Sequence, residues 1–202
     1  MFTGLIQAVG RIAQIEKGEQ DIRLRIETGK LPLAEVALGD SIATSGVCLT
    51  VTELPGGGYW ADVSPETLSL TSLGTKSIGD PVNLETSLTL NTPLGGHLVS
   101  GHVDGVGKIQ EIIEDARFWR VKVAAPENLA RYIAMKGSIC VDGTSLTVNQ
   151  VDGASFELTI IPQTWEETVF SEYEVGSRVN LEVDVIARYL ERLSQFGQRE
   201  AE

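Results

Sequence analysis

Two copies of one short motif organise this chain: Ser45-Gly46-Val47-Cys48-Leu49-Thr50-Val51 and, 97 residues later, Asp142-Gly143-Thr144-Ser145-Leu146-Thr147-Val148. Both copies keep a Gly-x-x-Leu-Thr-Val frame, but Ser145 replaces Cys48 and Asp142 replaces Ser45. The main-chain pattern is therefore repeated while the reactive side chains differ. This asymmetry is the first indication of function.

The same offset of 97 aligns the two halves of the chain from end to end. Matched residues include Gly4 and Gly101, Pro65 and Pro162, Thr67 and Thr164, and the runs 82–85 and 179–182, both of which read Val-Asn-Leu-Glu. A constant offset over this span predicts a duplicated domain. We expect one domain at 1–96, a second at 97–185 and a C-terminal segment at 186–202.

Each repeat alternates apolar and polar residues with the period of two that is typical of half-buried strands. Ile22, Leu24 and Ile26, for example, alternate with Arg23 and Arg25. Further strands are expected at 41–43, 48–53, 59–63 and 82–88, and in the second repeat at 119–123, 138–141, 145–151, 156–161 and 178–185. Short helical turns are expected at 31–34 and 128–133.

About six short strands in about 90 residues must hide their edges, and a closed barrel does so without a second sheet. The predicted fold is therefore all-β, with two tandem, internally repeated, six-stranded Greek-key barrels and a C-terminal α-helix. The helix is indicated by the apolar residues Ile186, Tyr189, Leu190, Leu193 and Phe196, which lie on one helical face. This face either packs on its own barrel or meets copies of itself, and the residues alone leave both alternatives open.

Composition excludes several functional classes. The net charge of -12 opposes binding to nucleic acid or to an anionic membrane surface. No signal peptide or membrane span is expected, and Cys48 and Cys140 are expected to be free thiols of a cytoplasmic protein. The sequence has no metal-ligand spacing and no Gly-rich phosphate loop, so we expect no metal and no cofactor.

The two histidines, His97 and His102, lie in one stretch. We expect His97 to be a satisfied surface or core residue. His102 is the better functional candidate because it aligns with Leu5, so that a group titrating near neutral pH occurs in one repeat only. Two similar pockets with unequal reactive groups suit two molecules of one ligand that play different parts, which is the logic of a dismutation.

The chain resembles the riboflavin synthase family of the alpha-chain type. The resemblance rests on Met1-Phe2-Thr3-Gly4-Leu5-Ile6, on 46–51, on 95–104, on 141–148 and on Ile161-Pro162-x-Thr164, and it spans residues 1 to about 195. It implies transfer of a four-carbon unit between two molecules of 6,7-dimethyl-8-ribityllumazine, giving riboflavin and 5-amino-6-ribitylaminouracil, without metal or redox cofactor. It also implies a homotrimer assembled through the C-terminal helix, with the active site between the first barrel of one subunit and the second barrel of a neighbour.

The resemblance implies substrate-binding residues in both halves. The first-barrel pocket would use Gly4, Leu5, Ile6, Cys48, Leu49, Thr50, Asp62, Val63, Ser64, Pro65, Glu66 and Thr67. The second would use Gly101, His102, Val103, Lys136, Ser145, Leu146, Thr147, Ile161, Pro162, Gln163, Thr164, Trp165 and Glu166. Main-chain groups of the shared frame would pair with the pyrimidinedione edge of the substrate.

Six residues are expected to take part in the chemistry. His102 would relay protons, Cys48 and Ser145 would act at C7 as hydrogen-bonding or transient nucleophilic groups, and Thr147 would orient the substrate. Lys136 and Asp142 would tune the local charge.

Ser45, Gln163, and Trp165 with Phe170 depart from the usual family pattern, which predicts a reshaped second pocket. The alternative is a lumazine protein-like module that binds a lumazine or flavin without turnover. The presence of Cys48, His102, Lys136 and Ser145 favours the enzyme.

Overall fold

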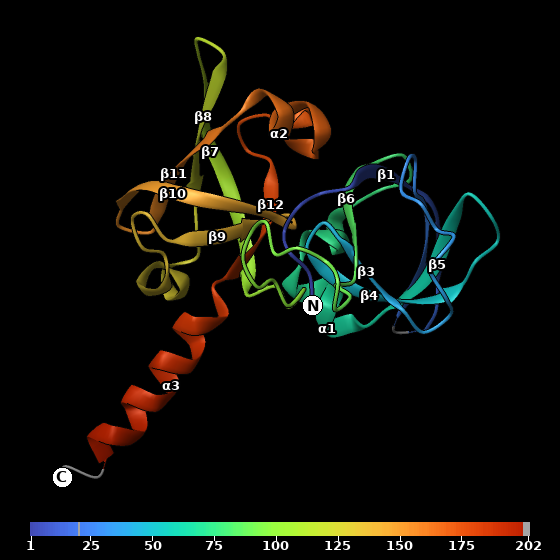
Figure 1. Ribbon diagram of the computed structural model, residues 1–202, viewed down its shortest axis with the longest axis horizontal. Helices are drawn as coiled ribbons and strands as arrows, with labels where there is room; N and C mark the ends of the chain where they lie inside the picture. Colours follow the sequence, from blue (N-terminus) through green and yellow to red (C-terminus); the bar gives the residue numbers. More distant parts are fainter. Residues whose placement is uncertain (20, 200–202) are drawn as a thin grey trace.

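The computed structural model describes residues 1–19 and 21–199. Each repeat closes into a six-stranded antiparallel barrel; the two barrels lie side by side, and a helix projects from the second (Figure 1). The all-β prediction, with tandem Greek-key barrels and a C-terminal helix, is confirmed.

The first barrel follows the cyclic strand order β1-β2-β5-β4-β3-β6. Its strands are β1 (Ala8–Lys17), β2 (Ile22–Glu27), β3 (Ser41–Thr44), β4 (Val47–Glu53), β5 (Gly58–Val63) and β6 (Pro81–Thr86), with α1 (Pro65–Leu70) and the 3-10 helix η1 (Ser72–Thr75) between β5 and β6. This order places the third strand beside the sixth, which is a Greek-key path.

The second barrel repeats the path as β7-β8-β11-β10-β9-β12. Its strands are β7 (Gly105–Asp115), β8 (Phe118–Ala124), β9 (Ser138–Val141), β10 (Thr144–Asp152), β11 (Ser155–Ile160) and β12 (Arg178–Val183). The 3-10 helix η2 (Glu127–Tyr132) follows β8, while α2 (Pro162–Glu167) and the 3-10 helix η3 (Val169–Glu172) follow β11.

The structure corrects the expected helical turns. Residues 128–132 of the expected turn at 128–133 belong to η2, but residues 31–34 do not form a helix. In the second repeat, the Leu129 N–H donates to the Pro126 carbonyl at 2.9 Å and closes the first turn of η2. Pro32 is the matching residue of the first repeat, and because proline has no N–H, this hydrogen bond cannot form there. The short helices α1 and α2 were not expected, nor were the bounds of β1 and β7.

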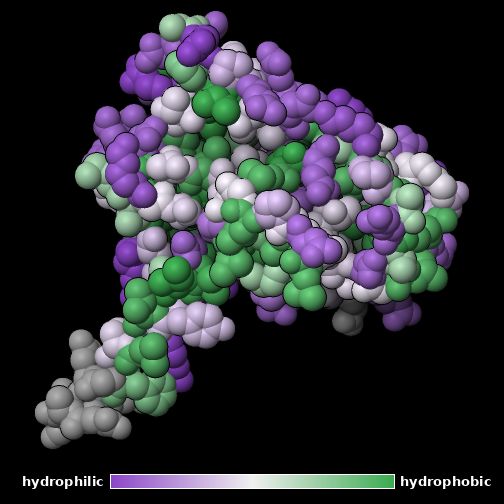
Figure 2. All heavy atoms as spheres, in the orientation of Figure 1, coloured by the Kyte–Doolittle hydropathy of each residue, from purple (hydrophilic) through white to green (hydrophobic). Residues whose placement is uncertain are grey.

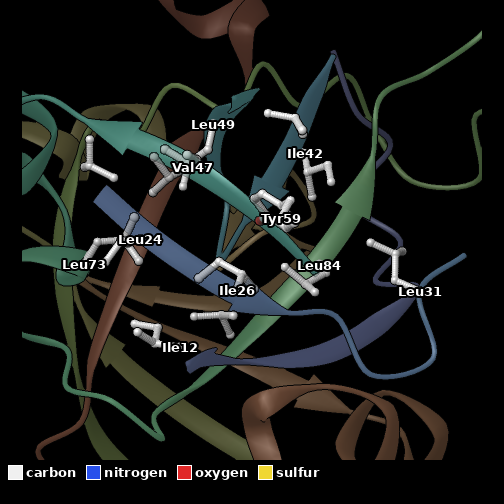
Figure 3. Close-up of a cluster of buried hydrophobic side chains, with 14 of the residues drawn as sticks. Ile12, Leu24, Ile26, Leu31, Ile42, Val47, Leu49, Tyr59, Leu73 and Leu84 are labelled. Carbon is white, nitrogen blue, oxygen red and sulfur yellow. The ribbon is translucent and has the colours of Figure 1, made fainter. Parts of the chain in front are cut away.

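The barrel interiors are hydrophobic cores rather than cavities. In the first barrel, Leu24 and Ile26 of β2, Tyr59 of β5 and Leu84 of β6 are fully buried and point inward (Figure 3). Each such apolar side chain contributes about 1.5–3 kcal/mol by leaving water. A ligand must therefore bind outside the barrels.

The hairpin turns of the repeated motif meet between the two barrels. Ser45-Gly46 and Asp142-Gly143 both have positive φ at each turn residue, as a type I′ hairpin requires. A Cβ atom on Gly46 would lie 2.7 Å from the backbone nitrogen of Gly143. The motif glycine is therefore required twice, for the turn and for the close contact between barrels.

Two asparagines from the recurring Val-Asn-Leu-Glu run join the barrels. The Asn83 side chain donates to the Asp142 carbonyl at 2.8 Å and accepts from the Val169 N–H at 2.9 Å. Asn180 of the second barrel makes the matching bonds to the first half. Its side chain donates to the Ser45 carbonyl at 2.8 Å and accepts from the Ser72 N–H at 2.6 Å. These buried bonds satisfy four main-chain groups and relate the halves by an approximate twofold axis.

The C-terminal helix α3 (Val185–Arg199) contacts its own half of the chain through Arg188, which pairs with Asp104 at 2.8 Å, and through Glu191, which accepts a hydrogen bond from Tyr132 and pairs with Arg131 at 2.8 Å. Its apolar face stays open: Ile186, Tyr189, Leu190, Leu193 and Phe196 are each more than half exposed. Figure 2 shows hydrophobic residues along the helix surface.

Among the described helices, none is both long and apolar enough to cross a membrane. Residues 200–202 of the expected tail lie outside the described residues.

Candidate active site

The reactive residues of the repeated motif face outward. Along β4, Leu49 and Val51 point into the core, so Cys48 and Thr50 point to the outside. Ser145 and Thr147 do the same on β10. We call the surfaces around Cys48 and Thr50, and around Ser145 and Thr147, the first and second outer faces.

In both barrels the strands beside these residues separate. The pairing of β4 with β5 covers Val51↔Ala61 and Glu53↔Trp60, and residues 47–50 extend past it. In the second barrel β10 pairs with β11 from Val148 onward, so that residues 144–147 likewise extend past the pairing. The N–H and C=O of one residue point to the same side of an antiparallel strand, and this side alternates along the chain. The main-chain groups of the frame threonines are therefore directed into the gap and can bind a planar ligand edge.

Residues 100–104 cross from the second barrel to the first outer face. We call this segment the second strap, because it belongs to the second repeat. Glu182 of β12 anchors it by accepting from the Ser100 N–H at 2.6 Å, the Gly101 N–H at 2.9 Å and the His102 N–H at 3.0 Å. The Gly101 carbonyl then accepts from the Cys48 N–H at 2.9 Å. Val103 packs against the core of the first barrel.

The first strap, residues 3–7, makes the reciprocal crossing. Glu85 of β6 accepts from the Thr3 N–H at 2.7 Å and the Gly4 N–H at 3.0 Å, and the Gly4 carbonyl accepts from the Ser145 N–H at 2.8 Å. Burial raises the pKa of Glu85, and these hydrogen bonds oppose the rise. The strap carries Gly4–Ile6 to the second outer face.

The straps revise the grouping inferred from the sequence. The resemblance implies that Gly4–Ile6 lie with Cys48 and that Gly101–Val103 lie with Ser145. Within one chain the structure exchanges them, so that each outer face combines a strand from one barrel with a strap anchored in the other. Glu85 and Glu182 were missed, although their recurrence at an offset of 97 was the signal that could have found them.

Glycine is required where each strap crosses. A Cβ atom on Gly101 would lie 2.6 Å from the Cys48 Cβ, and one on Gly4 would lie 2.5 Å from the Ser145 Cβ. Both glycines also have positive φ, at 81° and 76°. The matched glycines therefore allow the strap main chain to touch the reactive residue.

His97, expected to be a satisfied surface or core residue, is buried and contacts the second outer face. Its Nδ1 is hydrogen-bonded to the Ser145 Oγ at 2.6 Å. Burial lowers the pKa of His97, while the charges of Asp184 and Glu182 oppose that shift, so the neutral imidazole is favoured. Ser145 therefore has a histidine as its side-chain partner.

His102 is exposed, and its main chain is held on both sides. Its N–H donates to Glu182, and its carbonyl accepts from Arg188 at 2.8 Å. It follows Gly101, whose carbonyl accepts from the Cys48 N–H. Cys48 is half-buried and Cys140 is fully buried, and both are free thiols.

The two residues expected to tune charge lie in different settings. Lys136 is exposed, with φ at 66°, and its N–H donates to the Val148 carbonyl at 2.7 Å, next to the second outer face. Asp142 is buried between the barrels, where it accepts from the Asn180 N–H at 2.8 Å and from the Tyr173 hydroxyl. Burial raises the pKa of Asp142 to about 6, although both hydrogen bonds lower it.

The segments 62–67 and 161–166 occupy matching places after β5 and β11. Asp62 is exposed and pairs with Arg23 at 3.1 Å, and Ser64 caps α1 by accepting from the Thr67 N–H at 3.2 Å. In α2, Trp165 stacks on Trp119 with ring centroids 4.5 Å apart. The aromatic residue at 165 thus has an aromatic partner within the second barrel. The matching residues of the first repeat, Ile22 and Leu68, are both aliphatic.

A cavity of about 540 Å³ borders the first outer face. It is lined by Ser41, Asp40, parts of 32–36 and the segment 86–89, and Ser41 is the ladder partner of Thr50. Ser41 was not among the expected site residues. Among the residues that the structure describes, no group of three His, Cys, Asp or Glu side chains could hold a metal ion.

The chain is similar to known proteins both in sequence and in fold. The family model described as the lumazine binding domain matches residues 3–87 and again 100–184. Crystal structures of LumP complexed with riboflavin and with 6,7-dimethyl-8-(1'-D-ribityl) lumazine superpose with TM-scores of 0.83 and 0.81, at 25% identity over 91% of this chain and 99% of theirs. Fold and site thus define a protein with two lumazine-binding domains.

Curated relatives are more specific. Riboflavin synthase of Photobacterium phosphoreum is 47% identical over 96% of this chain and 88% of its own length, and that of Bacillus subtilis is 42% identical over 95% and 89%. Riboflavin synthase of Mycobacterium tuberculosis is 45% identical over 96% and 98%. This chain belongs to the riboflavin synthase family.

Proposed function

We propose that the chain catalyses the dismutation of two molecules of 6,7-dimethyl-8-ribityllumazine to riboflavin and 5-amino-6-ribitylaminouracil by transfer of a four-carbon unit. The enzyme is a transferase. The observation that carries the proposal is the pair of outer faces: their main-chain geometry is the same, but one carries Cys48 and the other Ser145. Equal binding with unequal reactive groups suits two identical substrates in donor and acceptor roles.

Each ring would be held by its polar edge in a strand gap. The main chain of Thr50 in the first barrel, and of Thr147 in the second, would pair with the pyrimidinedione edge. Segments 62–67 and 161–166 would close the far side of each gap. The strap residues Gly101–Val103 and Gly4–Ile6 would close the near side.

The chemistry needs a weak base and stabilisation of negative charge on the ring, because the C7 methyl group of the lumazine is a carbon acid. His102 would relay the proton near Cys48, and Cys48 and Ser145 would donate hydrogen bonds or add transiently at C7. His97 would hold the Ser145 hydroxyl in place, and Lys136 would supply positive charge. Asp142 would act as a positioning residue through the turn that precedes Ser145.

Phe2 and Val99 pair between the two straps, with Gly4 bound to Ser145 and Gly101 bound to Cys48. We propose a homotrimer in which the first barrel of one subunit faces the second barrel of a neighbour, as the family resemblance implies. The exposed apolar face of α3 supports assembly through that helix.

Stacking two rings in reacting register across that boundary would supply much of the rate, as an entropic gain. We also propose domain boundaries at 1–96, 97–185 and 186–202. The two free thiols support a cytoplasmic location.

Incubation of the purified protein with the lumazine alone tests the function. Yellow, fluorescent riboflavin should accumulate together with one equivalent of the aminouracil. A folded protein that forms no riboflavin at any enzyme concentration would refute the proposal. If that protein is coloured as isolated, the non-catalytic lumazine protein-like alternative holds instead.

A further inference from the structure

Arg188, on the first turn of α3, binds the second strap, and we call this contact the clamp. Its Nη2 donates to the His102 carbonyl at 2.8 Å and to the Asp104 carboxylate at 2.8 Å. The Arg188 side chain is 34% exposed and that of Asp104 is 16% exposed, so the ion pair is partly shielded from water. Charge-assisted bonds in such a setting are stronger than those of a fully exposed pair.

This clamp is absent from the first strap, although the rest of the anchoring is duplicated. Asp104 accepts from the Val183 N–H at 2.8 Å, and its counterpart Gln7 accepts from the Thr86 N–H at 3.0 Å. The position that matches Arg188, however, is the exposed Asn91. The Arg188 guanidinium group therefore has no equivalent at the first strap, and it binds only the strap that carries His102.

The strap connects three parts of the molecule. Glu182 holds Ser100–His102 from β12, Arg188 holds His102 and Asp104 from α3, and the Gly101 carbonyl binds Cys48 on β4. Because Arg188 is the fourth residue of α3, a change in the direction of the helix displaces the strap directly. The strap in turn covers Cys48 at van der Waals distance, since there is no room for even a Cβ atom on Gly101.

We propose that Arg188 is a positioning residue that locks the second strap against Cys48, so that the seating of α3 sets the geometry of the first outer face. The consequence for turnover rests on the proposed function, whereas the consequence for Cys48 does not. Assembly through α3 and the competence of the site are thereby linked through one guanidinium group.

The full-length Arg188→Met protein tests this proposal, with Arg131→Met as the matched control. Arg131 also pairs with an acid across the contact between α3 and the second barrel, but it does not touch the strap. The readout is the rate at which iodoacetamide alkylates Cys48, followed by mass spectrometry; the buried Cys140 is the internal reference. Arg188→Met should alkylate about tenfold faster, as expected when charge-assisted bonds that close the strap are lost, and Arg131→Met should match the wild type.

Turnover adds a second readout. Arg188→Met should lower kcat about tenfold and change KM by less than about threefold, and Arg188→Lys should fall between it and the wild type, because lysine keeps the charge but not the planar fork. If Arg188→Met does not fold, Arg188→Lys and Asp104→Asn take its place.

A folded Arg188→Met protein whose Cys48 reacts at the wild-type rate overturns the proposal, and so does equal acceleration in Arg131→Met. If the wild type forms no riboflavin while the alkylation pattern holds, the function fails and the clamp stands.

Discussion

The Cys48 N–H donates to the carbonyl of Gly101 at 2.9 Å, and this bond joins a strand of the first barrel to a strap anchored in the second. Ser145 and Gly4 form the matching bond at 2.8 Å. Each reactive side chain is therefore flanked by a segment from the other half. Neither half of the chain carries a complete outer face, although each has its own hydrophobic core.

Gly101→Ala should destabilise the fold by about 3 kcal/mol, because the new methyl group meets the Cys48 Cβ and the residue has positive φ. Gly56→Ala is the control, since Gly56 has a similar φ of 87° but no atom within 4 Å of its Cβ position. It should cost only about 1 kcal/mol, the conformational share alone. Urea unfolding of both variants measures the difference; equal losses would show that the contact with Cys48 has no energetic role.

Cys48→Ala and His102→Gln should lower kcat by about tenfold or more while leaving lumazine affinity within about threefold, because both residues are assigned to the chemical step. Steady-state kinetics and fluorescence titration with the lumazine separate the two effects. Thr52→Ala on the same strand is the control, because its hydroxyl bonds the Trp60 carbonyl away from the motif. Full turnover in both site variants would remove Cys48 and His102 from the mechanism.

Asp142→Asn should change the pH dependence of stability. The pKa of Asp142 is raised to about 6 in the folded protein, above its unfolded value of about 4, so the folded state holds this proton more tightly. The stabilisation is complete below pH 4 and is lost as pH rises from about 4 to 6. Asparagine carries no such proton, so the difference in unfolding free energy between wild type and variant should shift by about 2 kcal/mol, in favour of the variant, from pH 4 to 7. A difference in unfolding free energy that does not vary with pH would contradict the raised pKa of Asp142.

Leu193→Glu should dissociate the proposed trimer, because it places a charge in the centre of the exposed apolar face of α3. Ser194→Glu is the control, since it adds the same charge one residue along, off the apolar face. Light scattering should report the mass of a monomer for the first variant and that of the wild type for the second. An unchanged mass for Leu193→Glu would exclude this face as the assembly surface.

The barrels, the duplication and the terminal helix could be predicted from the residues, since period-two alternation and a helical apolar stripe are local patterns. The short helix expected at 31–34 failed because Pro32 removes a donor that the matching segment possesses. The contact of His97 with Ser145 could not be predicted, because it joins residues 48 positions apart and leaves no periodic trace.

The amino-acid sequence alone places Cys48 and Ser145 on an outer face, because each alternates with core residues along its strand. Which strap flanks which of them is a property of the folded chain alone. Glu85 and Glu182 point the straps across the interface, and the turns at Gly46 and Gly143 bring the barrels close enough for the crossing. The bonds from the Cys48 N–H to the Gly101 carbonyl and from the Ser145 N–H to the Gly4 carbonyl join residues of different repeats, so they exist only once both barrels have closed and docked.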